Sequence, residues 1–163
     1  YQANVIASVL AERLRGTYKM LHLPDGLSQD SLHMLMTCEP QIKEISDLIS
    51  RTDVLLFGIG TAMHMADQRH IADEVRKQLV DNHAVGEALG QYCDMDGKLI
   101  YSTNNIGLSL PDVAKVPNVI AVAGGQEKAS AIIGVMRACQ KGILIIDEQA
   151  AEGMRQLLQI SAL

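Results

Sequence analysis

A pair of glycines followed by a lysine is the pattern in this chain that could most directly bind a charged group: Gly124, Gly125 and Lys128 come straight after the apolar run 118–123. A strand that ends in glycine and passes directly into a helix leaves backbone N–H groups unpaired at the positive end of the helix dipole, where anions bind. Lys128 would add a full positive charge in the first helical turn. The pattern predicts a site for a phosphate or a phosphorylated small molecule, although such glycines also occur in plain tight connections.

A second segment has the same strand-to-glycine character. Residues 53–57 read as a short buried strand, and Gly58, Ile59, Gly60 and Thr61 follow it before a helical pattern begins. Neither segment completes a known nucleotide-binding loop, because residues 124–128 lack the length of a P-loop and GIGTAM does not complete G-x-G-x-x-G. The two segments together strengthen the prediction of an anion site and argue against a nicotinamide-dependent dehydrogenase.

Glu87 is the candidate for proton-transfer chemistry. In sugar-phosphate isomerisation a carboxylate moves a proton next to a carbonyl group while N–H groups and a lysine hold the phosphate. The alternative is a solvated glutamate on a helix. The sequence offers no second acid or base in a persuasive pattern near Glu87, no G-x-S-x-G elbow and no H-E-x-x-H spacing. We therefore expect binding without turnover, with no catalytic residue, no metal site and no cofactor.

The composition limits the class of protein. The chain has 163 residues, of which 48% are hydrophobic, a length that suits one buried core. The net charge of −5 argues against direct binding to nucleic acid, which requires clustered Lys and Arg. The 3 widely spaced cysteines indicate neither a disulfide framework nor a zinc site, and they fit a cytoplasmic setting. No apolar run is long enough to span a bilayer, so we expect no membrane partner.

Helical and extended patterns alternate along the chain and place the two glycine segments between them. Helices are expected over residues 2–14, 31–36, 40–50, 61–66, 72–80 and 148–158, and from the glycine pair to about residue 138. Strands are expected over residues 17–23, 53–57, 118–123 and 143–146. A small hairpin is expected where 91–93 and 98–101 flank Asp96-Gly97, a dipeptide that favours a type I′ turn.

The strand segments are continuous apolar runs, which is typical of strands covered on both faces. The sequence therefore predicts an α/β protein: a Rossmann-like, doubly wound, mostly parallel sheet with a small β-hairpin. In such folds ligands bind at the carboxyl ends of the strands, near the topological switch point. Residues 58–61 and 124–128 are expected to meet at that rim.

Four segments, in order, resemble the effector-binding domain of the SorC family of bacterial transcriptional regulators: DVLLFGIGTA (53–62), DNHAVGEALGQYCDMDGKLI (81–100), VPNVIAVAGGQEKASAI (116–132) and GILIIDEQAAEGMRQLL (142–158). The opening segment QANVIASVLAERLRGTYKMLHLP (2–24), with the LSQ that follows (27–29), is most similar to the branch that regulates central glycolytic genes. The resemblance spans nearly the whole chain. It implies a fold similar to that of sugar-phosphate isomerases and related transferases, so the isomerase alternative shares the architecture.

The resemblance also implies a function and partners. Such a domain senses a phosphorylated sugar, in this branch fructose 1,6-bisphosphate or a related glycolytic intermediate. An amino-terminal helix-turn-helix domain binds operator DNA within a homodimer or homotetramer, and the sugar changes how the dimers assemble and weakens repression. An oligomerisation module remains a third possibility, with the methionines at 34, 36, 63 and 65 packing against a partner or filling the core.

By the same resemblance, individual residues receive roles in effector binding. Lys128 and the N–H groups of Gly124 and Gly125 would hold one phosphate, and Arg69 is a candidate for the same end of the ligand. Gln68 stands beside Arg69, and the sequence leaves open which of the two faces the site. Glu87 would accept hydrogen bonds from sugar hydroxyls, and Gln2 would approach the other phosphate.

The family pattern includes parts that we expect to lie outside this chain. These are a first strand ending in a glycine- and threonine-rich phosphate loop, an arginine after that loop, and the helix-turn-helix domain. Residues 1–163 are therefore expected to be a single effector-binding domain that holds about half of the site, in a sheet short of at least one strand. A missing strand would expose backbone donors and acceptors on its neighbours. We expect either weak ligand binding or compensation by another copy of the chain.

Overall fold

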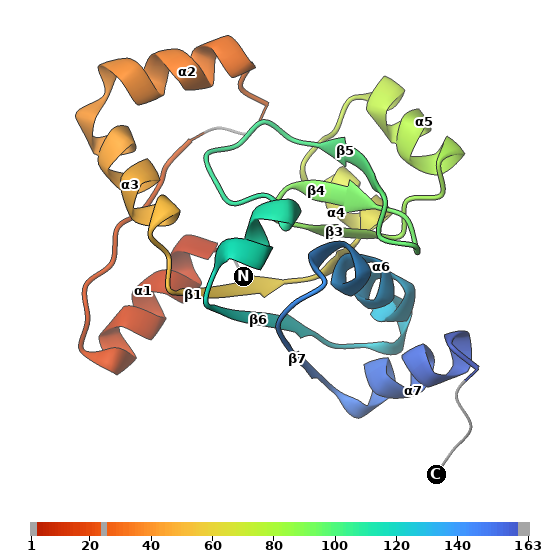
Figure 1. The fold of residues 1–163 in the computed structure, drawn as a ribbon. Helices are drawn as coiled ribbons and strands as arrows, with labels where there is room; N and C mark the ends of the chain where they lie inside the picture. Colours follow the sequence, from red (N-terminus) through yellow and green to blue (C-terminus); the bar gives the residue numbers. More distant parts are fainter. Residues whose placement is uncertain (1–2, 24–25, 160–163) are drawn as a thin grey trace.

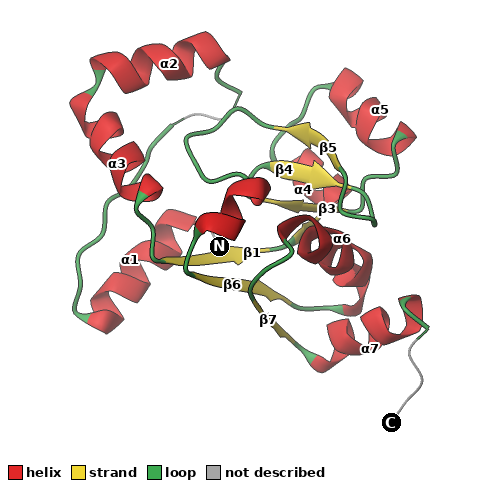
Figure 2. Cartoon of the chain, in the orientation of Figure 1, coloured by secondary structure: helices red, strands yellow, loops and turns green. Residues whose placement is uncertain are grey.

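The computed structural model describes residues 3–23 and 26–159, and it places two small sheets side by side (Figures 1 and 2). Three parallel strands form the first sheet in the order β1-β6-β7: β1 (Val54–Gly58), β6 (Asn118–Ala123) and β7 (Ile143–Ile146). Four antiparallel strands form the second in chain order: β2 (Gly60–Thr61), β3 (Gly86–Ala88), β4 (Gln91–Cys93) and β5 (Leu99–Ser102). The predicted α/β class with a parallel sheet is confirmed.

Helices connect and cover the strands, and local sequence signals fix several of their starts. Ser28 Oγ accepts a hydrogen bond from the Ser31 N–H at 3.1 Å at the start of α2, and Pro40 occupies the first turn of α3. The helices are α1 (Ala3–Leu14), α2 (Gln29–Cys38), α3 (Pro40–Ser50), α4 (Ala62–Gln68), α5 (Asp73–Asp81), α6 (Ala129–Cys139) and α7 (Glu148–Leu157), with the 3₁₀ helices η1 (Leu110–Lys115) and η2 (Gln126–Lys128).

The main core lies between the parallel sheet and α6. Val119 and Ala121 of β6 point to this inner side, where Ile132 and Val135 of α6 are fully buried against them. α7 joins the same cluster through Ala150. The connection from β6 through α6 to β7 is the crossover that two parallel strands require. The parallel pairing of β1 with β6 places the carboxyl ends of these two strands next to each other.

The outer face of the same sheet is exposed. Val54 and Leu56 of β1, Val122 of β6, and Ile143 and Ile145 of β7 are between 41% and 64% exposed. The prediction that these strands are covered on both faces is therefore wrong for the described part of the chain. The physical reason is that α6 and α7 both pack on the inner face.

The predicted strand at residues 17–23 is also wrong. Residues 17–23 belong to neither sheet, and Figure 1 shows the chain after α1 running along the outside of the molecule beside α3. It is held by side chains instead, since Lys19 pairs with Glu44 of α3 and the Asn4 amide donates to the Leu21 carbonyl at 3.4 Å. An extended pattern becomes a strand only where a neighbouring strand accepts its backbone hydrogen bonds.

The hairpin of β4 and β5 is present as predicted, but its turn is not of type I′. Gly97 has a positive φ of 84°, whereas Asp96 does not, and the Asp94 carboxylate accepts the N–H groups of Asp96 and Lys98. The turn with two successive positive φ angles, which type I′ requires, is Leu89-Gly90 between β3 and β4.

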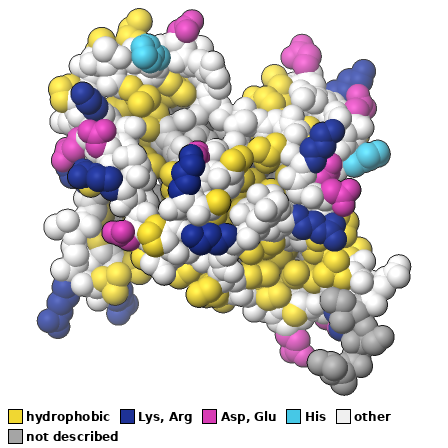
Figure 3. Space-filling model, viewed as in Figure 1, with side chains coloured by type: hydrophobic (Ala, Val, Ile, Leu, Met, Phe, Trp, Pro, Cys, Tyr) yellow, Lys and Arg dark blue, Asp and Glu magenta, His cyan; other side chains and the backbone are white. Residues whose placement is uncertain are grey.

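On the face seen in Figure 3, lysine and arginine side chains lie scattered among acidic and apolar ones, without a basic stripe.

No described helix is long and apolar enough to cross a membrane. Cys93 and Cys139 are buried free thiols, and burial raises their pKa values to about 12 and about 11.

Candidate functional site

The two glycine turns lie side by side at the carboxyl ends of the parallel strands. Gly58, the last residue of β1, is in register with Val122 of β6, so the chain leaves both strands at the same rim (Figure 1). β2, which contains Gly60, contacts η2, which contains Lys128. The structure therefore brings residues 58–61 and 124–128 together, as the topology of the sheet predicts.

Lys128 stands at the end of η2, directly before α6. Its backbone N–H donates to the Gly125 carbonyl at 3.2 Å, and its side chain is half-buried. The ion pairs among the described residues do not include Lys128. The rim thus carries a cationic side chain at the amino-terminal end of a helix, where the helix dipole also favours an anion.

Asp147, which the sequence reasoning missed, already occupies part of this rim. The Gly125 N–H donates to both of its carboxylate oxygens, at 3.1 and 2.9 Å, and a Cβ atom on Gly124 would lie 2.6 Å from its Oδ2 atom. The same carboxylate caps α7 by accepting the Ala150 N–H at 2.8 Å. These backbone donors, and to a smaller extent the charge of Lys128, lower the pKa of Asp147.

The engagement of Asp147 changes what the glycine turn can offer to a ligand. The Gly125 N–H already donates to Asp147, so a phosphate at this position would either share that N–H group with the Asp147 carboxylate or displace the carboxylate. The signal for Asp147 is in the sequence, since an aspartate directly after an apolar strand and before a helical pattern is a typical N-cap residue.

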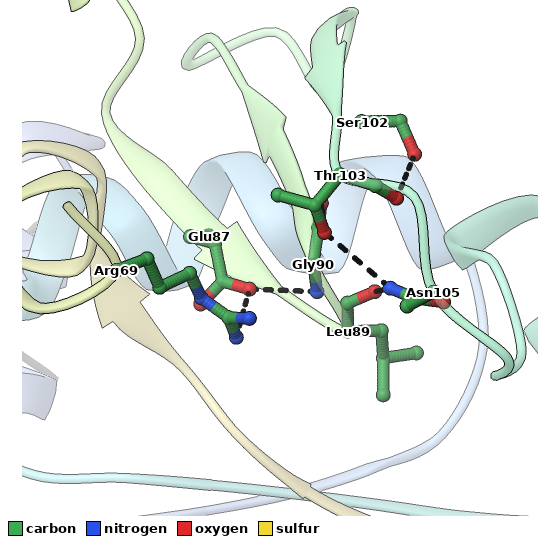
Figure 4. A network of polar contacts seen from close by, with 7 residues as sticks. All are labelled: Arg69, Glu87, Leu89, Gly90, Ser102, Thr103 and Asn105. Carbon is green, nitrogen blue, oxygen red and sulfur yellow. Dashed lines mark hydrogen bonds and ion pairs between the residues drawn. The ribbon is translucent and has the colours of Figure 1, made fainter. Parts of the chain in front are cut away.

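Glu87 and Arg69 form an ion pair beside the rim (Figure 4). Glu87 is 3% exposed, and its Oε1 atom accepts from Arg69 Nη2 at 3.1 Å and from the Gly90 N–H at 2.7 Å. Burial raises the pKa of Glu87, and the two donors oppose that shift. Glu87 lies on strand β3, so the alternative of a solvated helix glutamate is wrong.

The geometry also separates Arg69 from Gln68. Arg69 follows the end of α4 and points toward Glu87, whereas Gln68 is exposed. Glu87 lies opposite Gly60 in the β2–β3 register, which connects this pair to the first glycine turn. A Cβ atom on Gly60 would lie 2.5 Å from Cγ of Met65, so glycine permits α4 to pack closely there.

The methionines that the sequence left open fall into two groups. Met63 and Met65 fill a second core cluster around Leu79 and Tyr92, whereas Met34 and Met36 of α2 are exposed.

Two cavities lie away from the predicted residues. One of about 430 Å³ lies between α3 and η1, and one of about 230 Å³ lies beside the segment that follows β5. Neither is lined by any of the residues assigned to effector binding. Gln2 lies outside the described residues.

A protein-family model matches almost the whole chain, including the residues of this rim. The family model described as a “putative sugar-binding domain” matches residues 1–156. The chain belongs to this sugar-binding domain family of SorC-type regulators. The resemblance found in the sequence is thereby confirmed.

Relatives of the SorC-type domain are named as transcriptional regulators. The chain is 38% identical to the Central glycolytic genes regulator of Bacillus subtilis over 151 residues, which is 93% of the chain and 44% of the relative. It is 27% identical to the Deoxyribonucleoside regulator of the same organism, covering 94% of the chain and 50% of that protein. The chain thus spans about half the length of these curated relatives.

A solved structure shows the same fold. The SorC family transcriptional regulator from Enterococcus faecalis is 38% identical, with a TM-score of 0.85, over 94% of this chain and 62% of that one. The full-length Sorbitol Operon Regulator SorC from Klebsiella pneumoniae, at 23% identity and a TM-score of 0.78, shares the fold. The chain is therefore a sugar-binding domain of the type found in transcriptional regulators.

Proposed function

We propose that this chain is the effector-sensing part of a longer transcriptional repressor and that it binds a phosphorylated sugar, with fructose 1,6-bisphosphate or a related glycolytic intermediate as the first candidate. The ligand would control the assembly of homodimers or homotetramers and thereby operator binding through a helix-turn-helix domain outside these 163 residues. The observation that carries the proposal is the meeting of the two glycine turns beside the Arg69–Glu87 pair. The 38% identity to a regulator of central glycolytic genes supports the choice of sugar.

The proposal gives each side of the rim a separate task. Lys128 and the amide groups at the start of η2 bind a phosphate of the ligand. Arg69, which already pairs with Glu87, would also bind the phosphate at the same end of the ligand. Glu87 would accept hydrogen bonds from sugar hydroxyls. The first glycine turn would line the site between the phosphate-binding residues and Glu87, with Gly58, Ile59, Gly60 and Thr61. Gln2 would approach a second phosphate.

Binding without turnover is part of the proposal. The buried Glu87, with its raised pKa, is the group that an isomerase would use as a base. That alternative predicts interconversion of aldose and ketose phosphates or exchange of a substrate proton with solvent. Incubation of the chain with glucose 6-phosphate and fructose 6-phosphate in deuterated water, followed by NMR, separates the two: turnover contradicts the sensor function.

The binding proposal is tested by calorimetry on the full-length regulator with a panel of sugar phosphates. Replacing Lys128 with alanine removes a charged phosphate contact, so we expect the affinity for fructose 1,6-bisphosphate to fall by about tenfold or more. Lys77→Ala is the matched control, because Lys77 is an exposed lysine on α5 and its loss changes the net charge equally. Equal affinities of the Lys128→Ala and Lys77→Ala proteins would place the phosphate elsewhere.

A further inference from the structure

The turn between β3 and β4 has an unusual backbone for its sequence. Leu89 has a φ of 54° and Gly90 a φ of 78°, so both residues adopt the left-handed conformation. Glycine adopts it freely, but leucine does so at an energetic cost because its Cβ atom crowds the following carbonyl group. A leucine in this conformation persists only where its surroundings hold the turn in place.

Two side chains from the segment after β5 hold the turn from one side (Figure 4). The Gly90 carbonyl accepts both the backbone N–H of Thr103, at 2.8 Å, and its hydroxyl, at 3.0 Å. The Leu89 carbonyl accepts the Asn105 side-chain amide at 3.1 Å. The fit is close, since a Cβ atom on Gly90 would overlap with both Thr103 Oγ1 and Asn105 Nδ2.

The other side of the same turn holds Glu87. The Leu89 carbonyl and the Gly90 N–H belong to one planar peptide unit and point in opposite directions. Asn105 binds the carbonyl end of that unit, and the N–H end donates to Glu87 Oε1 at 2.7 Å. Fixing the carbonyl therefore fixes the direction of the N–H group, and with it the carboxylate oxygen that also contacts Arg69.

We propose that Thr103 and Asn105 are positioning residues for sugar recognition: Asn105 through the Leu89 carbonyl and Thr103 through the Gly90 carbonyl fix the Leu89–Gly90 turn, which holds the Glu87 carboxylate where it can accept hydrogen bonds from ligand hydroxyls. The proposal rests on the proposed function, because it concerns the selectivity of the same site. Within the described part of the chain, the side-chain hydrogen bonds of Thr103 and Asn105 reach the Leu89–Gly90 turn and each other, away from Lys128, so their loss should leave phosphate binding unchanged.

The ligand test compares two bisphosphates on the full-length regulator. Fructose 1,6-bisphosphate carries hydroxyls, and hexane-1,6-diol bisphosphate has two phosphates and none. In the double variant Thr103→Val with Asn105→Ala, affinity for the sugar should fall by about tenfold, the effect of losing a well-placed hydrogen bond to a charged group, while affinity for the diol bisphosphate changes less than about twofold. Thr103→Ser in place of Thr103→Val should restore part of the sugar affinity.

The control is Asn104→Ala. This variant also loses a side-chain amide from the same segment, but Asn104 donates to the Leu27 carbonyl, away from the turn. It should keep the preference for the sugar. An equal loss for both bisphosphates in the Thr103/Asn105 variant, or no loss for either, would overturn the positioning role.

A second measurement tests the positioning role without a ligand. It therefore still applies if the regulator binds neither bisphosphate, and that lack of binding would count against the proposed function alone. The Gly90 N–H stabilises the charged form of Glu87, so loosening the turn should raise the pKa of that carboxyl further. Titration of the ¹³C-labelled Glu87 carboxyl by NMR on the 163-residue chain should show a rise of about half a pH unit or more in the Thr103/Asn105 variant and none in the control. An unchanged pKa in both would contradict the proposal.

Discussion

On the inner face of the parallel sheet, Val119 and Ala121 are almost fully buried beneath α6, whereas on the outer face of the same sheet Val122 and Ile143 are 41% and 64% exposed. Successive residues of a strand point to opposite sides of the sheet, and these strands are apolar at successive positions. Both faces therefore carry apolar side chains. Runs that are apolar on both sides are typical of a sheet covered by two layers. The described residues supply one of those layers, and the candidate site lies at the rim of that better-packed side.

The largest expected effect tests this contrast within the chain. Replacing Ile132, which is fully buried on α6, with alanine should lower the free energy of unfolding by about 2 to 5 kcal/mol. Ile145→Ala removes the same side-chain atoms from the outer face, where Ile145 is 52% exposed, and should cost less than about 1 kcal/mol. Denaturant titration of both variants measures the two values. Equal costs would mean that the faces do not differ in packing.

A smaller effect is expected when the same outer-face substitution is made in a longer protein. The chain covers 62% of the solved Enterococcus faecalis regulator, so proteins of this type contain further sequence that could cover the outer face. If it does so in the full-length form, Ile145→Ala should cost about 1 to 3 kcal/mol more there than in the 163-residue chain. An equal, small cost in both forms would show that the outer face stays open.

The inner part of the fold was predictable because its signals are local and strong. The apolar run 118–123, its two glycines and the helix after them define β6, η2 and α6, and the rule for parallel sheets brings residues 58–61 to the same rim. Strand 17–23 could not be judged in this way. Its residues suit a strand, but a strand also needs a neighbour, and a sequence pattern does not show whether one is present.

The candidate site was predicted by residue type more than by geometry. Glu87 was selected, yet its place on a strand was not foreseen, because Gly86–Ala88 has none of the β-branched residues that favour strands. The type I′ turn was predicted at Asp96-Gly97 because that dipeptide favours it. The turn with two positive φ angles is instead Leu89-Gly90, which the sequence did not indicate because leucine rarely adopts a positive φ. The Arg69–Glu87 pair joins residues 18 apart through tertiary packing, which no local pattern reveals.

The smallest expected effect concerns Asp147, which anchors α7 on the inner face and joins it to the glycine turn. Its pKa is lowered in the folded protein, so the carboxylate contributes stability above its ordinary pKa of about 4, and that contribution is lost as the pH falls through the folded value. Asp147→Ala should therefore lower the Tm at pH 7, and the difference from the wild type should shrink below about pH 4. Asp147→Asn retains a cap oxygen and should lose less at pH 7. A Tm difference that stays constant from pH 7 to pH 3 would show that the carboxylate charge does not help to hold α7 on the inner face.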